Sequence, residues 1–378
     1  MIIGIDAINI RNGGGLNHLV ELLNEFKKQK KPEDRFVIWS NKRTLEKINN
    51  DNSFYKIHLP IFEKNFLFHS YWRLFYLSKE LKYHKCELLF IPGGSYIGKF
   101  KPVISMSHNI LPFDSLEIKR YFPSIMYFKF NILRYVQHRT FKKSKGVIFL
   151  NNYARDLISK KNTFFLNKSK IIPHGVDNKF YIKNRYIRKF SEFSSIEPVK
   201  IIYVSSIDYY KHQDKVVLAV EKLCKKNIPI SLSLIGSAYS PALKKLRKIM
   251  NNINKNNLNV EYFNFLEHDK LINYYKNADV AVFASTCENL PNILLEYLAA
   301  KIPIACSKRS PMLDILDNNA EFFDPENVDS ISKALYLLLK SDKTRERLSI
   351  NSHNLIKKYK WKDTATETLD YFRANLEY

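Results

Sequence analysis

Short apolar strands alternate with helical patterns along nearly the whole chain, and this alternation limits the possible folds more than any other feature. In the first half, strand patterns occupy residues 2–7, 36–40, 88–92, 103–107 and 147–150. In the second half, strands at residues 201–205, 231–236, 260–265, 280–285 and 302–307 alternate with helices at residues 214–225, 242–252, 269–277 and 291–300. Such alternation predicts parallel sheets with crossover helices. We therefore expect an α/β fold with two doubly wound, Rossmann-like domains that face each other across a cleft.

The alternation stops between Asp177 and Val199, where the sequence is polar, basic and aperiodic. We place an interdomain linker at residues 178–198, between an N-terminal domain of residues 1–177 and a C-terminal domain of residues 199–355. We expect residues 356–378 to form a C-terminal helix that can cross back to the N-terminal domain. The length of 378 residues suits two domains. Because ligands bind at the carboxyl ends of parallel strands, we expect the functional site between the two halves.

The formal net charge of +24 points to an anionic partner, such as phosphate groups or a membrane surface. Part of this charge reflects abundant lysine, which accompanies many Asn, Ile, Phe and Tyr residues and is typical of an AT-rich genome. The sequence has no zinc-ligand spacing, helix-turn-helix signal or RNA-recognition signature. We therefore expect no nucleic acid as a partner, although a basic nucleic-acid-binding protein remains an alternative.

Apolar stretches in the chain are shorter than the roughly 18–20 residues that a membrane span needs. The first residues enter a strand pattern directly, without the basic start and apolar core of a signal peptide. The cysteines lack the paired spacing of a zinc site or a disulfide framework, so we expect reduced thiols at Cys86, Cys224, Cys287 and Cys306. These features predict a cytoplasmic protein.

The most informative local segment is residues 286–300, which follows the strand pattern at residues 280–285. Pro291 suits the first turn of a helix because its missing N–H has no partner there. The free N–H groups of a helix start, with the positive end of the helix dipole, can bind a diphosphate. Glu288 precedes the helix. Glu296 lies about five residues after the helix start, roughly 8 Å along the axis, which is a plausible reach from a diphosphate to ribose hydroxyls. The alternative is a helix start whose acidic residue only favours the dipole.

The Glu288-x7-Glu296 spacing in this setting resembles the retaining glycosyltransferases of family 4, which have the two-domain GT-B architecture. The resemblance covers nearly the whole chain as an ordered series of motifs: Ile172-Pro-His-Gly-Val-Asp177, Tyr203-Val-Ser-Ser-Ile-Asp-Tyr-Tyr-Lys211, Leu271 to Val280, Phe323-Asp-Pro-Glu-Asn-Val-Asp329 and Trp361-Lys-Asp-Thr-Ala365. Each motif alone is weak, but their order is specific. The resemblance implies an acceptor-binding N-terminal domain and a C-terminal domain that binds a nucleotide sugar.

The resemblance also implies roles for the residues of the donor site. Glu296 holds the ribose, Glu288 faces the transferred sugar, and Lys211 offsets the charge of the leaving diphosphate. The alternative for Lys211 is an exposed lysine at a helix start. Ser206 stands where the family has a basic residue, so the phosphate site has one fixed cation fewer. The donor contacts implied in addition are Gly14, Gly15, Ser206, Gly236, Leu266, Asn289, Leu290 and Pro291. UDP and GDP sugars are the expected donors.

A glycine-rich loop, Asn12-Gly-Gly-Gly-Leu16, lies between the first strand and the first helix pattern. It is either a plain tight turn or, by the resemblance, a loop that closes on donor phosphate and acceptor. The chain contains no Asp-x-Asp pair, which metal-dependent transferases use to hold a cation against a diphosphate. We therefore predict that the protein uses no metal and no other cofactor.

Three histidines of the first half are candidates of unequal strength. His108 ends a strand and resembles the histidine that the family places near the sugar, so we group it with Glu288 and Lys211 as catalytic. Asn109 replaces the aspartate of the family at the next position, and a structural histidine is the alternative for His108. We give His174 a minor role, and we expect His18 to lie on the surface.

Two stretches, residues 62–85 and 121–143, are rich in Phe, Tyr, Trp and Leu interleaved with Lys and Arg. Basic amphipathic segments of this kind can lie in a membrane interface. The alternative is ordinary helices whose aromatic face is core. Because the family uses this half for the acceptor, we expect a glycan or polyprenyl-linked acceptor, with peripheral contact at the inner face of the cytoplasmic membrane.

Together these patterns predict a retaining hexosyltransferase of surface polysaccharide biosynthesis, of the O-antigen or capsule type. The first half offers no convincing nucleophile for a double displacement, so we expect departure and attack on the same face of the sugar. A nucleotide-sugar epimerase of the same architecture and an inactive sugar-nucleotide-binding subunit remain alternatives.

Overall fold

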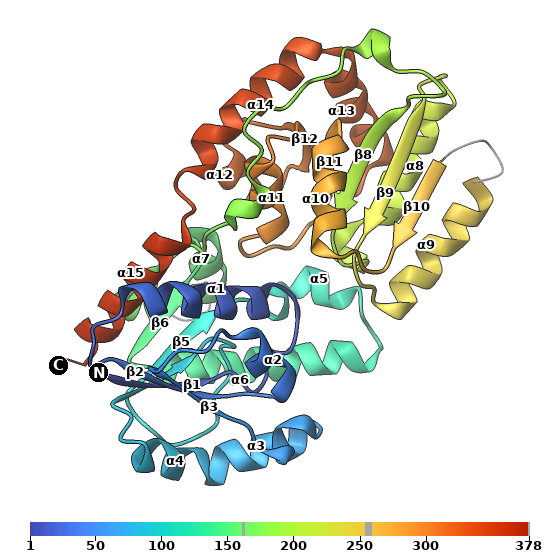
Figure 1. Cartoon of the computed structure of the whole chain (residues 1–378). Helices are drawn as coiled ribbons and strands as arrows, with labels where there is room; N and C mark the ends of the chain where they lie inside the picture. The colour runs from blue at the N-terminus through green and yellow to red at the C-terminus, as the bar shows by residue number, and fades with distance from the viewer. Residues whose placement is uncertain (161–162, 254–258, 377–378) are drawn as a thin grey trace. The chain divides into compact units, whose positions relative to one another are not determined.

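The structure is a computed structural model that describes residues 1–160, 163–253 and 259–376 (Figure 1). The chain forms two compact units, each built around its own parallel sheet. Unit 1 contains Met1–Gly175 and the C-terminal residues from Tyr359, and unit 2 contains Val176–Lys358. The chain therefore passes between the units twice, after Gly175 and after Lys358.

The sheet of unit 1 has seven strands in the order β3-β2-β1-β4-β5-β6-β7, and every pairing is parallel. The strands are β1 (Ile2–Asp6), β2 (Arg35–Trp39), β3 (Phe54–Ile57), β4 (Leu88–Ile91), β5 (Val103–Ser107), β6 (Gly146–Phe149) and β7 (Ser169–Ile171). The strand order reverses between β1 and β4. In open parallel sheets, ligands bind beyond the carboxyl ends of the strands at such a reversal.

Helices cover both faces of this sheet: α1 (Gly13–Gln29), α2 (Lys42–Lys47), α3 (Phe66–Phe75), α4 (Leu77–Tyr83), α5 (Ser115–Lys119), α6 (Ile125–Lys143), α7 (Asn152–Ser159) and α15 (Trp361–Ala374). Phe36 of β2 stacks on Phe26 of α1 with ring centroids 5.2 Å apart. Trp39 of the same strand packs instead in a buried cluster with Trp72 of α3 and Leu77 of α4. Because strand residues separated by an odd number of positions point to opposite faces, α1 covers one face and α3 with α4 covers the other.

The sheet of unit 2 has six parallel strands in the order β10-β9-β8-β11-β12-β13. The strands are β8 (Val199–Val204), β9 (Ile230–Ile235), β10 (Asn259–Phe263), β11 (Val280–Phe283), β12 (Ile304–Ser307) and β13 (Glu321–Phe323). The helices are α8 (Gln213–Cys224), α9 (Ser240–Ile253), α10 (His268–Asn277), α11 (Asn292–Ala299), α12 (Met312–Leu316), α13 (Val328–Lys340) and α14 (Asp342–Ile356). The expectation of two doubly wound parallel-sheet domains is confirmed.

Residues 178–198, expected to be a linker, belong to unit 2 in the structure. Arg185 gives the physical reason. Its guanidinium donates hydrogen bonds to the backbone oxygens of Ala300 and Ala278, both at 2.7 Å, and to that of Tyr275. The linker assignment is therefore corrected. A segment held by side-chain hydrogen bonds to carbonyl groups shows no apolar period in the sequence.

The C-terminal segment 356–378 is divided between the units. Residues up to Lys358 belong to unit 2, and helix α15 packs against α1 in unit 1. The ring of Phe372 in α15 meets that of Phe26 in α1 at a centroid distance of 6.1 Å. Residues 377 and 378 lie outside the described part of the chain.

Among the described residues, no helix combines the length and the apolar character needed to cross a membrane. The four cysteines, all of them in the described ranges, are free thiols.

Candidate functional site

Most of the residues expected to bind the donor lie where the strands of unit 2 end, whereas Gly14 and Gly15 lie in unit 1. Ser206 follows β8, Gly236 follows β9, and the segment from Ala284 to Pro291 joins β11 to α11. Because β9, β8 and β11 are neighbours in the sheet, their carboxyl ends lie at one edge. The sheet order therefore brings together positions that are far apart in the sequence.

Lys211 and Glu288 form an ion pair at this edge, with the ammonium of Lys211 donating to Oε1 of Glu288. The two side chains are only 9% and 13% exposed. The ammonium also lies 5.5 Å from the ring centroid of Phe283. The hydroxyl of Tyr203 donates to the backbone oxygen of Lys211 at 2.6 Å and fixes the turn. Lys211 is thus a buried cation already paired with a carboxylate, and not an exposed lysine at a helix start.

The segment that carries Glu288 is tied to the turn that carries Lys211. The backbone N–H of Thr286 donates to the backbone oxygen of Tyr210 at 2.9 Å. Helix α11 then begins at Asn292, with Pro291 as its N-cap residue, so the helix starts one residue later than expected. Asn289, Leu290 and Pro291 are buried in this connection.

Glu296 lies on α11 and is buried. Its Oε2 accepts a hydrogen bond from the hydroxyl of Tyr275 at 2.6 Å. Burial raises the pKa of Glu296 to about 7, although the hydrogen bond from Tyr275 and the nearby ammonium of Lys179 oppose the shift. Asp177 adds to it. A carboxylate in this environment is a strong hydrogen-bond acceptor that is only partly ionised at neutral pH.

Ser206 and Gly236 shape the bottom of the same edge. Gly236 has a φ of 144°, and a Cβ atom there would lie 2.3 Å from the backbone oxygen of Ser205, so only glycine fits. Ser206 is exposed, and its backbone oxygen accepts a hydrogen bond from Nε2 of Gln213 at 2.8 Å. Leu266, after β10, is half-buried. Ser206, Gly236 and Leu266 carry no positive charge, so none of them substitutes for the basic residue expected at position 206.

The glycine loop of unit 1 forms the start of α1. Gly13 has a φ of 66°, and a Cβ atom at Gly13 or Gly15 would meet no other atom within 4 Å. The N-cap residue Asn12 makes no side-chain hydrogen bond to the helix. The helix thus begins with Gly13, Gly14 and Gly15, and Gly13 and Gly15 lie beside open space, a setting that favours an anionic or polar ligand.

His108 lies at the end of β5 in a cluster of rings. Its ring centroid is 4.4 Å from that of His18, and the ring of His18 lies 5.2 Å from that of Trp361. The expectation that His18 lies on the surface is wrong, because it is 1% exposed and faces this cluster. The ring of His174, also buried, lies 6.1 Å from that of His18. Unit 1 therefore brings all three histidines together.

His108 and His18 are held in the neutral form. Burial, with a smaller contribution from His174, lowers the pKa of His108 to about 3, and burial also lowers the pKa of His18. Neither ring nitrogen of His18 has a hydrogen-bond partner among the described residues, nor has Nε2 of His108. The side chain of Asn109 accepts a hydrogen bond from the backbone N–H of Leu111 at 3.0 Å, which makes Asn109 part of a turn.

One face of α3 exposes large apolar side chains, whereas Trp72 on the same helix packs in the core. Leu67 is 75% exposed, Tyr71 is 53% exposed and Phe75 is 54% exposed. The opposite face of the helix is anchored by Arg73, whose buried Nε donates to Asp6 at 2.6 Å. Helix α6 exposes a similar stripe at helical spacing: Ile125, Phe128, Ile132 and Tyr135.

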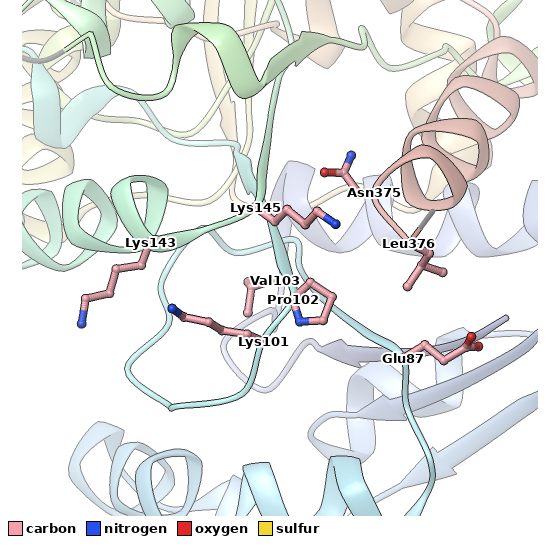
Figure 2. Close-up of a pocket in the computed structure, with 8 residues that line it drawn as sticks. All are labelled: Glu87, Lys101, Pro102, Val103, Lys143, Lys145, Asn375 and Leu376. Carbon is pink, nitrogen blue, oxygen red and sulfur yellow. The ribbon is translucent and has the colours of Figure 1, made fainter. Parts of the chain in front are cut away.

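A cavity of about 690 Å³ lies at the N-terminal ends of strands β4, β5 and β6 in unit 1 (Figure 2). Its lining includes Lys101, Lys143, Lys145 and Glu87, whose side chains Figure 2 shows around the opening. It contains no residue that the sequence analysis assigned to the site. Lys101 and Lys143 are exposed, as are many lysines of this chain, so this cavity alone does not indicate a binding site.

The site also contains two tyrosines that the sequence analysis did not single out. Tyr203 fixes the turn of Lys211, and Tyr275 holds Glu296. Tyr275 lies within the motif from Leu271 to Val280, and this membership was the only available signal.

Comparison with known proteins finds a family similarity in the second unit. A family model described as glycosyl transferases group 1 matches residues 187–355. An uncharacterized glycosyltransferase of Methanocaldococcus jannaschii is 24% identical over 219 residues, which cover 56% of this chain and 55% of that protein. The O-antigen chain mannosyltransferase B of Escherichia coli is 23% identical over 114 residues, 30% of each chain. The chain thus matches about half of the first curated relative and less of the second.

Solved structures match the whole fold. A sucrose-phosphate synthase from Thermosynechococcus elongatus has a TM-score of 0.75 at 14% identity, covering 99% of this chain and 98% of that one. HepE from Anabaena, solved in complex with UDP and glucose, has a TM-score of 0.71 at 12% identity and covers 99% and 100%. At these identities the likeness concerns the fold. The chain thus has the fold of two GT-B-type domains, and residues 187–355 of its second unit are similar to the group 1 glycosyl transferases.

Proposed function

We propose that this protein transfers a hexose from a nucleoside-diphosphate sugar to a glycan or lipid-linked glycan acceptor. The observation that carries the proposal is the arrangement of Lys211, Glu288 and Glu296 at one edge of the unit 2 sheet. It places a buried cation, a carboxylate paired with it, and a second carboxylate on the following helix. These groups match the diphosphate, the sugar and the ribose of one donor molecule.

The proposed donor site works through charge and hydrogen bonding. Lys211 binds the diphosphate and offsets the negative charge that grows on it as the glycosidic bond breaks. Glu288, released from Lys211, accepts hydrogen bonds from hydroxyl groups of the sugar. Glu296 accepts hydrogen bonds from the ribose. UDP and GDP are the proposed nucleotides, and the complex of HepE with UDP and glucose supports the first.

The finer features of the reaction are part of the proposal. Retention of configuration follows from the resemblance to family 4, with the leaving diphosphate taking the proton of the acceptor. Metal independence rests on Lys211 as the fixed cation of the phosphate site. His108, kept neutral by burial, is a hydrogen-bonding group for the sugar and not a proton carrier at neutral pH. The similarity to an O-antigen chain mannosyltransferase supports a place in surface polysaccharide synthesis.

A nucleotide-binding panel tests the donor site. UDP, GDP, ADP and dTDP are added to the protein, and the shift in melting temperature is measured for the wild type and for Lys211→Ala and Glu296→Ala. We expect one nucleotide to stabilise the wild type and both variants to lose most of the shift. Lys222→Ala is the matched control, because this lysine of unit 2 forms only an exposed ion pair with Asp329. If no nucleotide stabilises the wild type, the donor assignment is wrong.

Transfer itself is tested with a labelled sugar. The donor that the panel selects is incubated with a lipid extract containing glycan acceptors, and label in the glycan product is measured. A nucleotide-sugar epimerase would change the sugar with donor alone. The transferase proposal requires that product formation depend on the acceptor and be abolished in Glu288→Gln.

We also propose that unit 1 contacts an anionic membrane surface through the exposed apolar faces of α3 and α6. The face of α3 carries large apolar side chains, and the ammonium of Lys64 lies 5.0 Å from the ring centroid of Phe68 beside it. Contiguous exposed apolar surface marks an interaction site in a water-soluble fold. The net charge of +24 makes an anionic bilayer the complementary partner. This contact would hold the protein at the inner face of the cytoplasmic membrane.

Vesicle flotation tests the membrane proposal. We expect binding to vesicles with about one third anionic lipid and weak binding to neutral vesicles at 0.15 M salt. Leu67→Asp with Tyr71→Asp on α3, and Ile132→Asp on α6, should each reduce binding. Ile350→Asp is the control, since Ile350 is 69% exposed on α14 of unit 2. Equal binding of control and test variants would refute the assignment of this surface.

A further inference from the structure

Glu296 is held from one side only. Tyr275 donates to its Oε2 at 2.6 Å, and no hydrogen bond to its Oε1 is found among the described residues. Glu296 keeps 9% of its surface exposed. Among the described residues, the protein therefore fixes one oxygen of the carboxylate by a hydrogen bond and leaves the other for a ligand.

Tyr275 itself is immobilised. Its side chain is buried, with its ring 5.6 Å from that of Tyr297 at an interplanar angle of 75° and 5.6 Å from that of Phe180. A buried phenol that contacts two other rings cannot rotate away from Glu296 without disturbing the core. Its hydroxyl is thus a donor in a fixed position.

The helices that carry the two residues are tied together at their ends. Tyr275 lies near the end of α10, and Glu296 lies on α11. Arg185 donates to the backbone oxygens of Tyr275 in the last turn of α10, of Ala278 directly after α10, and of Ala300 directly after α11. The segment first expected to be a linker therefore fixes the spacing between Tyr275 and Glu296.

We propose that Tyr275 is a positioning residue of the donor site, which orients Glu296 so that its open oxygen receives the ribose hydroxyls. The inference rests on the proposed donor function and adds a residue to it. A hydroxyl group that is held rigidly and donates a hydrogen bond to a carboxylate fixes the orientation of that carboxylate before the ligand binds. It also favours the ionised form, which accepts hydrogen bonds from both ribose hydroxyls.

The charge state of Glu296 provides a readout that a purely structural role would not change. The groups that face Glu296 are Tyr275 from α10, Tyr297 from α11, and Asp177 and Lys179 from the start of unit 2, before strand β8. Burial raises its pKa to about 7. Because the hydroxyl of Tyr275 stabilises the carboxylate, Tyr275→Phe should raise the pKa of Glu296 further.

The test measures nucleotide affinity against pH by isothermal titration calorimetry, with the nucleoside diphosphate selected by the melting panel. The wild type should bind more tightly as the pH rises through about 7. Tyr275→Phe should move this midpoint upward and weaken binding about tenfold at neutral pH, since a hydrogen bond to a charged group contributes about that factor to ionisation. Neither Tyr275→Phe nor Glu296→Gln should affect the binding of the 2′,3′-dideoxy nucleotide, which lacks the ribose hydroxyls.

Tyr297→Phe is the matched control. The hydroxyl of Tyr297 accepts a hydrogen bond from the backbone N–H of Val204 at 2.7 Å, so its loss should lower the melting temperature without moving the pH midpoint. The proposal is overturned if the wild type and Tyr275→Phe share one midpoint, or if the dideoxy nucleotide shows the same loss as the ribose form. If the wild type binds no nucleoside diphosphate at any pH, the proposed function itself fails, and the role of Tyr275 fails with it.

Discussion

Replacing Glu288 with glutamine should tighten nucleotide binding while it abolishes transfer. In the structure the ammonium of Lys211 is already occupied by the carboxylate of Glu288, and both side chains are largely buried. An incoming diphosphate must therefore share Lys211 with a group of its own charge. Glutamine keeps the shape of the side chain and removes the negative charge, so the cation becomes available to the nucleotide.

The magnitude is estimated from the repulsion between Glu288 and a phosphate group that both contact the ammonium of Lys211. At an effective dielectric constant of about 20, two like charges roughly 5 Å apart repel each other by about 3 kcal/mol. Solvent at the open side of the site and mobile ions reduce this value, and we expect about 1.4 kcal/mol, which is tenfold in affinity. Transfer should fall by at least about 100-fold, the usual loss when a group that acts on the transition state is removed. Lys211→Met should have the opposite effect on binding, because it removes the attraction and leaves Glu288 unpaired.

The assay is isothermal titration of the selected nucleotide at about 0.02 M and 0.15 M salt, beside a transfer assay with the same preparations. The gain in Glu288→Gln should be larger at low salt. Asp329→Asn is the control, because it removes an exposed carboxylate from an ion pair with Lys222 in the same unit. If Glu288→Gln weakens binding as much as Lys211→Met, then Glu288 supports Lys211 in the bound state, and the reasoning from competition is refuted.

Three further predictions concern stability. Asp6→Asn should cost about 3–5 kcal/mol in urea denaturation, because it leaves the buried guanidinium of Arg73 without its partner, and a cost below about 1 kcal/mol would contradict this. Gly175→Ala should lower the melting temperature, since its Cβ would lie 2.1 Å from the backbone nitrogen of Trp361; an unchanged melting temperature would show that the chain shifts freely there. The pKa of Glu296 rises from 4.5 to about 7 on folding, so the folded state holds this proton where the unfolded state has lost it, and stability should fall as the pH rises from about 4.5 to 7. Glu296→Gln should remove this slope, and an equal slope in both proteins would refute the assignment.

The sequence by itself determined the architecture and the region of the site. Strands and helices leave local patterns, and the alternation along the chain was sufficient to predict two parallel sheets. The segment from Glu288 to Glu296 was found from its spacing and from the order of the surrounding motifs. Each strand, helix or motif is recognised from residues that are close together in the chain, and the order of the motifs is read directly along the sequence.

The tertiary structure decided what each side chain touches. The pairing of Lys211 with Glu288 and of Tyr275 with Glu296 depends on which strands are neighbours in the sheet, and no local pattern records this. The same holds for His18. Its position in a helical pattern predicted a surface residue, but its ring packs against His108 at the end of β5. The aromatic face of α3 is the converse case. Its residue types suit a core equally well, and only the packing of the opposite face, anchored by Arg73, leaves it exposed to solvent.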